Sequence, residues 1–140
     1  MIVTLTNHSL TAQIDSIGAQ LISLKDTAAD TEYIWQRDPA YWKSCSPLLF
    51  PTVGNCRDGK YTLNGQTYTI PKHGFCRNAD FAVSVLSKQE ASFTITDSPE
   101  TRACYPFAFQ LKLTYTLAED GIQIHYTVTN PGTETMYYQL

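Results

Sequence analysis

The sequence lacks the features that mark several classes of protein. Its 140 residues include no apolar run long enough to span a bilayer, and Met1 is not followed by a charged and then an apolar region typical of a secretory signal. Only 16% of the residues are charged, the formal net charge is -3 and no run of like charge occurs. This composition argues against a nucleic-acid or membrane partner. No glycine-rich loop of the phosphate-binding type is present, so no cofactor is predicted.

Cysteine is also scarce. Cys45, Cys56, Cys76 and Cys104 are far apart in the sequence, and no Cys-x-x-Cys pair occurs. This pattern fits reduced thiols in a cytoplasmic protein better than a framework of disulfides. A zinc site built from the first three cysteines and His73 is an alternative, but structural zinc sites normally pair their ligands at short spacing. We therefore predict a cytoplasmic protein with no metal.

The sequence does contain many short segments of alternating hydrophobicity, which is typical of half-buried antiparallel strands. Strands are expected over residues 2–6, 10–14, 19–24, 60–63, 66–70, 81–86, 92–96, 107–117 and 122–129. The dipeptide Asn64-Gly65 tolerates positive φ at both centres of a type I′ turn, which predicts a hairpin. Residues 136–140 are expected to begin one more strand, and no segment has a helical period. Length and pattern predict one all-β domain.

The stretch 35–58 interrupts this pattern with three prolines and several aromatic residues, including Trp35, Tyr41 and Trp42. Proline cannot donate to a central ladder of hydrogen bonds, so a loop or an edge is predicted. The aromatic residues have two interpretations. They form a small core beneath a long loop, or they floor a polar cleft in which the C–H faces of a sugar pack on the rings.

Four segments combine residues that a β-domain does not need for folding. They are Trp35-x-x-Asp38-x-x-x-Trp42, Pro47-x-Leu49-Phe50-Pro51-x-Val53-Gly54, Asp58-Gly59-Lys60-Tyr61-x-x-Asn64-Gly65-x-x-Tyr68 and His73-Gly74-Phe75-x-Arg77-x-x-x-Phe81. In this order they resemble the aldose 1-epimerase (galactose mutarotase) family, most of all its bacterial branch associated with lactose and galactose catabolism. The similarity continues through 105–117 and 126–130, so it covers nearly the whole chain.

The resemblance implies a fold and a reaction. The fold is an antiparallel, all-β galactose mutarotase-like supersandwich, in which residues 1–140 form a single β-sandwich domain, the N-terminal portion of a longer mutarotase-like domain. The reaction interconverts the α and β anomers of an aldose by opening and reclosing the sugar ring. It needs a base to take the proton of the anomeric hydroxyl and an acid to donate to the ring oxygen.

The resemblance also implies the site residues. His73 corresponds to the family histidine that positions the sugar, although a lone loop histidine more often satisfies backbone groups. Arg77 closes the same motif, either as a donor to sugar hydroxyls or as a structural ion-pair partner. Asn55 stands where many members carry an arginine, and Arg57 is a shifted substitute. With Phe75, these are the predicted substrate-binding residues.

The acid and the base are expected outside these residues. By the resemblance, a strand like 136–140 leads into a Gly-x-His-Pro segment with the acid, and a glutamate base follows later. His8 and His125 are expected at the surface, and the acidic residues fall in turns or at strand ends. We therefore predict the sugar-positioning half of an epimerase site. The alternatives are a non-catalytic carbohydrate-binding module and a structural β-domain that forms homo-oligomers through exposed strand edges.

Overall fold

The protein is described by a computed structural model that covers all 140 residues. In chain order the strands are β1 (Ile2–Thr6), β2 (Leu10–Asp15), β3 (Gln20–Asp26), β4 (Thr31–Glu32), β5 (Lys60–Leu63), β6 (Gln66–Thr69), β7 (Ala82–Val85), β8 (Glu90–Thr96), β9 (Gln110–Leu117) and β10 (Ile122–Thr129). The helices are η1 (Arg57–Gly59), η2 (Cys76–Asn78) and α1 (Pro99–Cys104). None of them has the length and the apolar character needed to cross a membrane.

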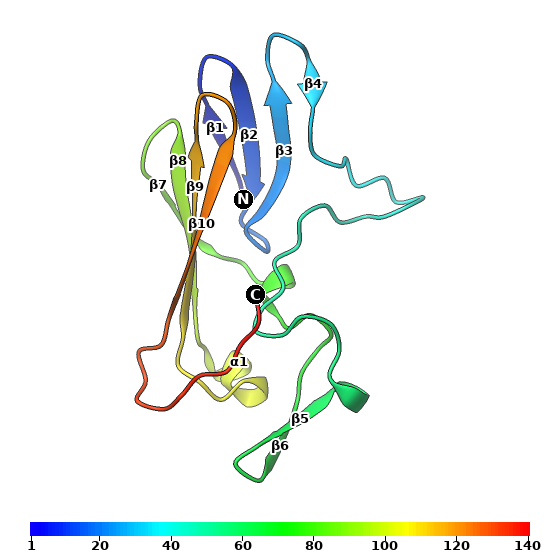
Figure 1. The fold of residues 1–140 in the computed structure, drawn as a ribbon, viewed down its shortest axis with the longest axis vertical. Coiled ribbons are helices and arrows are strands. Elements are labelled where there is room, and N and C mark those ends of the chain that lie inside the picture. Colours follow the sequence, from blue (N-terminus) through cyan, green and yellow to red (C-terminus); the bar gives the residue numbers. More distant parts are fainter.

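The strands form two four-stranded antiparallel sheets and a separate hairpin. One sheet has the order β1-β2-β3-β4, and the other has the order β10-β9-β8-β7. The two sheets lie against each other, whereas the β5–β6 hairpin extends from the far end of the molecule (Figure 1). The antiparallel all-β architecture is therefore confirmed.

One core fills the space between the two sheets. Alternate residues of each strand are buried, as period-two alternation predicts. The cluster holds Leu5, Ile14 and Leu21 from one sheet and Phe93 and Leu113 from the other. A buried hydrogen bond also joins the sheets, because the hydroxyl of a β9 tyrosine donates to a carbonyl of the β2–β3 turn at 2.6 Å.

Most of the expected strands are confirmed, and so is the type I′ hairpin. Asn64 and Gly65 both have positive φ, +50° and +80°, between β5 and β6. Residues 136–140 form no strand, so that prediction is wrong. The prediction that no segment is helical was also wrong. Ser98 caps the short helix α1 through a reciprocal capping box, and Pro99 lies in its first turn.

The long loop contains no hidden aromatic core. Tyr41 is 82% exposed, and Trp35 and Trp42 are 43% and 48% exposed. The indole N–H of Trp35 donates to the carbonyl of Trp42 at 2.7 Å, so the tip of the loop is held by its own contacts. In Figure 1 this segment extends away from both sheets. The interpretation as a small core beneath the loop is therefore wrong.

Candidate functional site

The two most distinctive sequence segments meet through their backbones. Phe50 and Gly74 form a parallel bridge, and the carbonyl of Phe50 accepts hydrogen bonds from the N–H groups of Phe75 at 3.1 Å and Cys76 at 3.3 Å. A Cβ at position 74 would overlap the carbonyl of Phe50 and lie 2.7 Å from the nitrogen of Pro51. Only glycine allows this close approach, which explains why the histidine is followed by glycine in the sequence.

His73 adopts a backbone conformation that favours glycine or asparagine. Its φ is +67°, and it occupies the third position of a turn closed by the N–H of Gly74 donating to the carbonyl of Pro71 at 2.9 Å. That position of a type II turn normally needs positive φ. A left-handed residue other than glycine costs about 1–2 kcal/mol. Such strained residues cluster at functional sites, and His73 is one of six non-glycine residues of the chain with positive φ.

The imidazole of His73 is held on one side by Gly54. The N–H of Gly54 donates to Nδ1 of His73 at 3.0 Å, and the backbone N–H of His73 donates to the carbonyl of Gly54 at 2.8 Å. Because Nδ1 accepts this hydrogen bond, the neutral ring carries its proton on Nε2. The side chain is half-buried, and Nε2 has no protein partner. The arrangement therefore offers one fixed donor to a ligand.

The other predicted polar residues are near this pair in the sequence but make no contact that fixes their side chains. Asn55 directly follows Gly54 and is exposed, and Arg57 begins the exposed helix η1. Arg77 lies on η2 and is half-buried, with no ion pair and no side-chain hydrogen bond. Arg77 forms no ion pair within residues 1–140, and its guanidinium donors are unused there.

Phe75 supports the site from behind. Its ring lies 6.3 Å from that of Phe50 and 5.8 Å from that of Phe109, in an aromatic cluster that also includes Tyr105. These contacts anchor the histidine loop on the core at the start of β9. The sequence predicted that Phe75 contacts the sugar. In the structure its ring packs in this aromatic cluster and holds the histidine loop on the core.

The last residues of the chain pack beside the first motif. The N–H of Gln139 donates to the carbonyl of Pro51, and its side-chain oxygen accepts from the N–H of Val53, both at 2.9 Å. The ring of Tyr138 lies 5.7 Å from that of Phe50. Thus Tyr138 and Gln139 pack on the 50–53 segment, although they form no strand.

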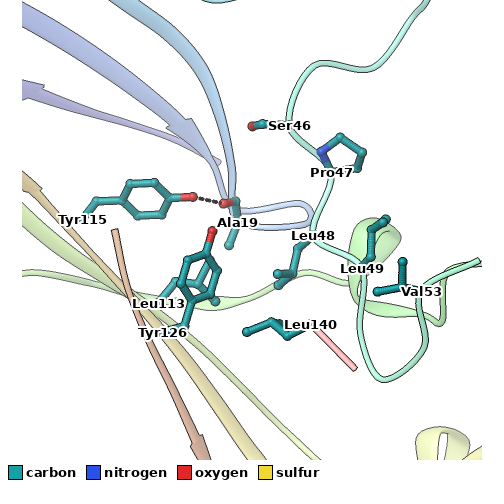
Figure 2. Close-up of a pocket in the computed structure, with 10 residues that line it drawn as sticks. All are labelled: Ala19, Ser46, Pro47, Leu48, Leu49, Val53, Leu113, Tyr115, Tyr126 and Leu140. Carbon is teal, nitrogen blue, oxygen red and sulfur yellow. Dashed lines mark hydrogen bonds between the residues drawn. The ribbon is translucent and has the colours of Figure 1, made fainter. Parts of the chain in front are cut away.

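A cavity of about 440 Å³ opens between the 46–53 loop and the sheet of β9 and β10. Figure 2 shows Leu48, Tyr126 and Leu140 converging on it, and eight of its ten lining residues are hydrophobic. None of the five predicted site residues lines it or any of the other three cavities. The sequence did not predict this cavity, because residues far apart in the chain form it.

The cysteines form no metal site. No group of three or more His, Cys, Asp or Glu side chains comes together in a way that would hold a metal ion, so the zinc alternative is wrong. All four thiols are free. Burial raises the pKa of the Cys76 thiol to about 12, so the cysteine nearest His73 in the sequence stays protonated and is a poor nucleophile.

Comparison with known proteins shows the family of the chain. A family model described as aldose 1-epimerase matches residues 1–140. Protein LacX of Lactococcus lactis is 36% identical over 144 residues, which cover 99% of this chain and 48% of that protein. The chain thus spans about half the length of the curated relatives it matches.

Two solved structures have the same fold over nearly the whole chain. A galactose mutarotase-like protein from Lactobacillus casei is 38% identical with a TM-score of 0.94, covering 97% of this chain and 46% of its own. A galactose mutarotase related enzyme from Lactobacillus acidophilus is also 38% identical, with a TM-score of 0.93 and coverage of 97% and 45%.

Proposed function

The chain belongs to the aldose 1-epimerase family, and from this premise we propose that it supplies the sugar-positioning half of an epimerase site. The complete reaction interconverts the α and β anomers of an aldose. In it, the Nε2–H of His73 donates a hydrogen bond to an oxygen on the ring side of the sugar. Arg77 donates to neighbouring hydroxyls, with Asn55 and Arg57 at the rim.

The observation that carries this proposal is the hydrogen bond from the N–H of Gly54 to Nδ1 of His73. It fixes the ring orientation and the tautomer, so that the free nitrogen is a donor and not an acceptor. A ring fixed in this way loses little conformational freedom when a ligand binds. Under this proposal the strained turn has a role. It is the turn in which His73, with positive φ, accepts the hydrogen bond from Gly54.

A neutral sugar is the ligand that we propose for this site. A hexose presents hydroxyl oxygens as acceptors, and the groups at hand are one imidazole N–H and the five donors of a guanidinium. The oxygens of an aldose match these donors without adding a buried charge. Galactose and glucose both offer a ring oxygen and the same vicinal 2- and 3-hydroxyls to these donors.

Proton transfer needs two further groups, and we propose that they come from outside residues 1–140. His8 lies in the turn between β1 and β2, and His125 lies on the solvent side of β10. Neither makes a side-chain hydrogen bond to the site. The 140 residues alone are then expected to bind an aldose without accelerating anomer exchange. We also propose that residues 1–140 form a single domain and that the protein is cytoplasmic. The alternative function is a carbohydrate-binding module without catalysis.

Binding is tested by titrating the chain into galactose or glucose and following the broadening of the sugar resonances by NMR. The informative variant is His73→Asn, because asparagine tolerates positive φ but does not reach as far as the imidazole. Loss of one hydrogen bond is expected to weaken binding by roughly 3- to 10-fold. The matched control is His125→Gln on exposed β10, which is expected to leave the affinity unchanged.

Two results would contradict the proposal. Equal affinities for the wild-type chain and His73→Asn would remove His73 from the sugar site. Polarimetry provides the second test. If the wild-type chain accelerates anomer exchange and His73→Asn does not, the acid and base lie within these residues, and the division of the site is wrong.

A further inference from the structure

Gln139 bonds twice to one short segment that comes much earlier in the chain. Its backbone N–H donates to the carbonyl of Pro51, and its side-chain oxygen accepts from the N–H of Val53, both at 2.9 Å. Figure 1 shows the last residues, drawn in red, returning from β10 to the centre of the molecule, where this segment lies. One residue thus fixes the backbone on both sides of Thr52.

The 50–54 segment is also bonded to the histidine turn at both of its ends. The carbonyl of Phe50 accepts from the N–H groups of residues 75–76, and Gly54 exchanges two hydrogen bonds with His73. Between these two fixed points, the segment bonds to Gln139. Three segments that are far apart in the sequence are therefore joined, and 50–54 is the one that bonds to both of the others.

The direction of the Gly54 N–H depends on the peptide units that precede it. Glycine has no Cβ and allows many backbone conformations, so residue 54 does not fix its own N–H. The peptide bond is planar. Only the φ and ψ of Val53 therefore separate the N–H that Gln139 holds from the N–H that donates to His73. Fixing the first N–H restricts the direction of the second.

Gln139 is itself attached to the core through its neighbours. The buried Tyr105 donates its hydroxyl to the carbonyl of Tyr137 at 2.9 Å, and the ring of Tyr138 lies 5.7 Å from that of Phe50. The side chain of Gln139 therefore starts from a fixed backbone, and its amide oxygen reaches Val53 from a defined position.

The bond to Val53 uses only the acceptor of the glutamine amide. The backbone N–H needs an acceptor here, and glutamine supplies an oxygen without a charge. Glutamate offers an oxygen at the same place in its side chain, whereas methionine has a similar length but only a weak sulfur acceptor. The need for an oxygen can therefore be separated from the need for side-chain length.

We propose that Gln139 is a positioning residue for His73. It holds the 51–53 backbone so that the N–H of Gly54 stays on Nδ1, which keeps the proton of the neutral ring on Nε2. The effect on the ring follows from hydrogen bonds of the chain alone. The consequence for a bound aldose, to which Nε2–H donates, rests on the function proposed above.

The test compares three variants of the ¹⁵N-labelled chain without sugar. Gln139→Met removes the acceptor and Gln139→Glu keeps it. The control Gln123→Met makes the same exchange on β10, where the glutamine side chain forms no hydrogen bond within residues 1–140. In Gln139→Met the amides of Val53 and Gly54 are expected to exchange roughly 3- to 10-fold faster, the factor that one hydrogen bond supplies. The Nδ1 resonance of His73 is expected to move toward its protonated value, while the other two variants match the wild type.

Sugar affinity is the second readout and tests the last step. Gln139→Met is expected to bind galactose or glucose roughly 3- to 10-fold more weakly than the wild type, and Gln139→Glu is expected to restore the wild-type affinity. A wild-type chain that binds no sugar would refute the proposed function. The exchange rates and the Nδ1 resonance of His73 would then still decide the role of Gln139.

Either of two results with the variants would overturn the positioning role. One is faster exchange of Val53 with an unchanged Gly54 amide and an unchanged Nδ1 resonance, which would make Gln139 a structural contact only. The other is an equal loss in Gln139→Glu and Gln139→Met. If Gln139→Met does not fold, exchange of the wild-type chain in increasing urea decides, because Val53 and Gly54 are expected to open together. A Gly54 amide that stays protected after Val53 has opened would refute the proposal.

Discussion

Replacing Gly74 with alanine tests whether the close contact between the two motif segments builds the candidate site. The new Cβ would overlap the carbonyl of Phe50 and stand 2.7 Å from the nitrogen of Pro51, where the obstacle is backbone that cannot swing away. The segments must then separate, which breaks the hydrogen bonds from the N–H groups of Phe75 and Cys76 to Phe50.

The magnitude follows from two costs and one partly compensating gain. Alanine at a φ of +69° costs about 1–2 kcal/mol, and each lost hydrogen bond costs about 0.5–1.5 kcal/mol. Lower entropy of the unfolded chain returns about 0.4–1 kcal/mol. The two lost hydrogen bonds and the φ together cost more than the entropy returns, so the net loss of unfolding free energy for Gly74→Ala is about 1–5 kcal/mol, a large part of the stability of a typical domain.

Urea denaturation of three alanine variants separates these contributions. Gly65 has a φ of +80° and nothing within 4 Å of its would-be Cβ, so Gly65→Ala loses about 1 kcal/mol from the φ alone. Gly121 has neither positive φ nor a close neighbour, so Gly121→Ala stays within about 0.5 kcal/mol of the wild type. If Gly74→Ala is no more destabilising than Gly65→Ala, the contact with Phe50 does not organise the loop and the reasoning is refuted.

Three further predictions concern groups around the core. Tyr115→Phe removes the buried hydroxyl that donates to the carbonyl of Ala19, and denaturant unfolding is expected to show a loss of about 1–3 kcal/mol; an unchanged midpoint would mean that water or another donor replaces it. The hydrogen bond from Arg102 lowers the pKa of Asp97, so its stabilisation is present above about pH 4 and is lost as the pH falls through the lowered native value. Asp97→Asn should therefore be less stable than the wild type at pH 7 and equal to it near pH 2. Finally, iodoacetamide at pH 8 should modify Cys76, whose pKa is raised by burial to about 12, only in urea; modification in the native state would show that its loop opens.

Local pattern predicted the strands, while the departures came from an element too short to show a period and from non-local contacts. Alternation in 110–117 and 122–129 is strict because one face of each strand packs on the core, so it can be read directly from the sequence. Helix α1 has six residues, which are too few to show a helical period. The sequence signal for this helix was the dipeptide Ser98-Pro99, a capping residue followed by a proline at the first helical position. Residues 136–140 look like the beginning of a strand in the sequence, but Gln139 is held by one side-chain and one backbone hydrogen bond to the 51–53 segment.

The candidate site was predictable in part. The resemblance identified His73, but no periodicity predicts that Gly54 would donate to Nδ1 across 19 residues of sequence. That contact leaves Nε2 as the free nitrogen, and so determines that the neutral imidazole donates to a ligand. The exposed aromatic loop shows the opposite case, since apolar composition predicted burial that the structure does not provide.

The central claim is that His73 presents Nε2–H to a sugar while Gly54 holds Nδ1. The most direct measurement is the pair of imidazole ¹⁵N shifts of His73, followed as galactose or glucose is added to the ¹⁵N-labelled chain. The account predicts an unprotonated Nδ1 that hardly moves and a protonated Nε2 that shifts with sugar, while the resonances of His8 and His125 stay constant. A proton on Nδ1 in the free chain, or no shift of Nε2 at saturating sugar, would contradict it.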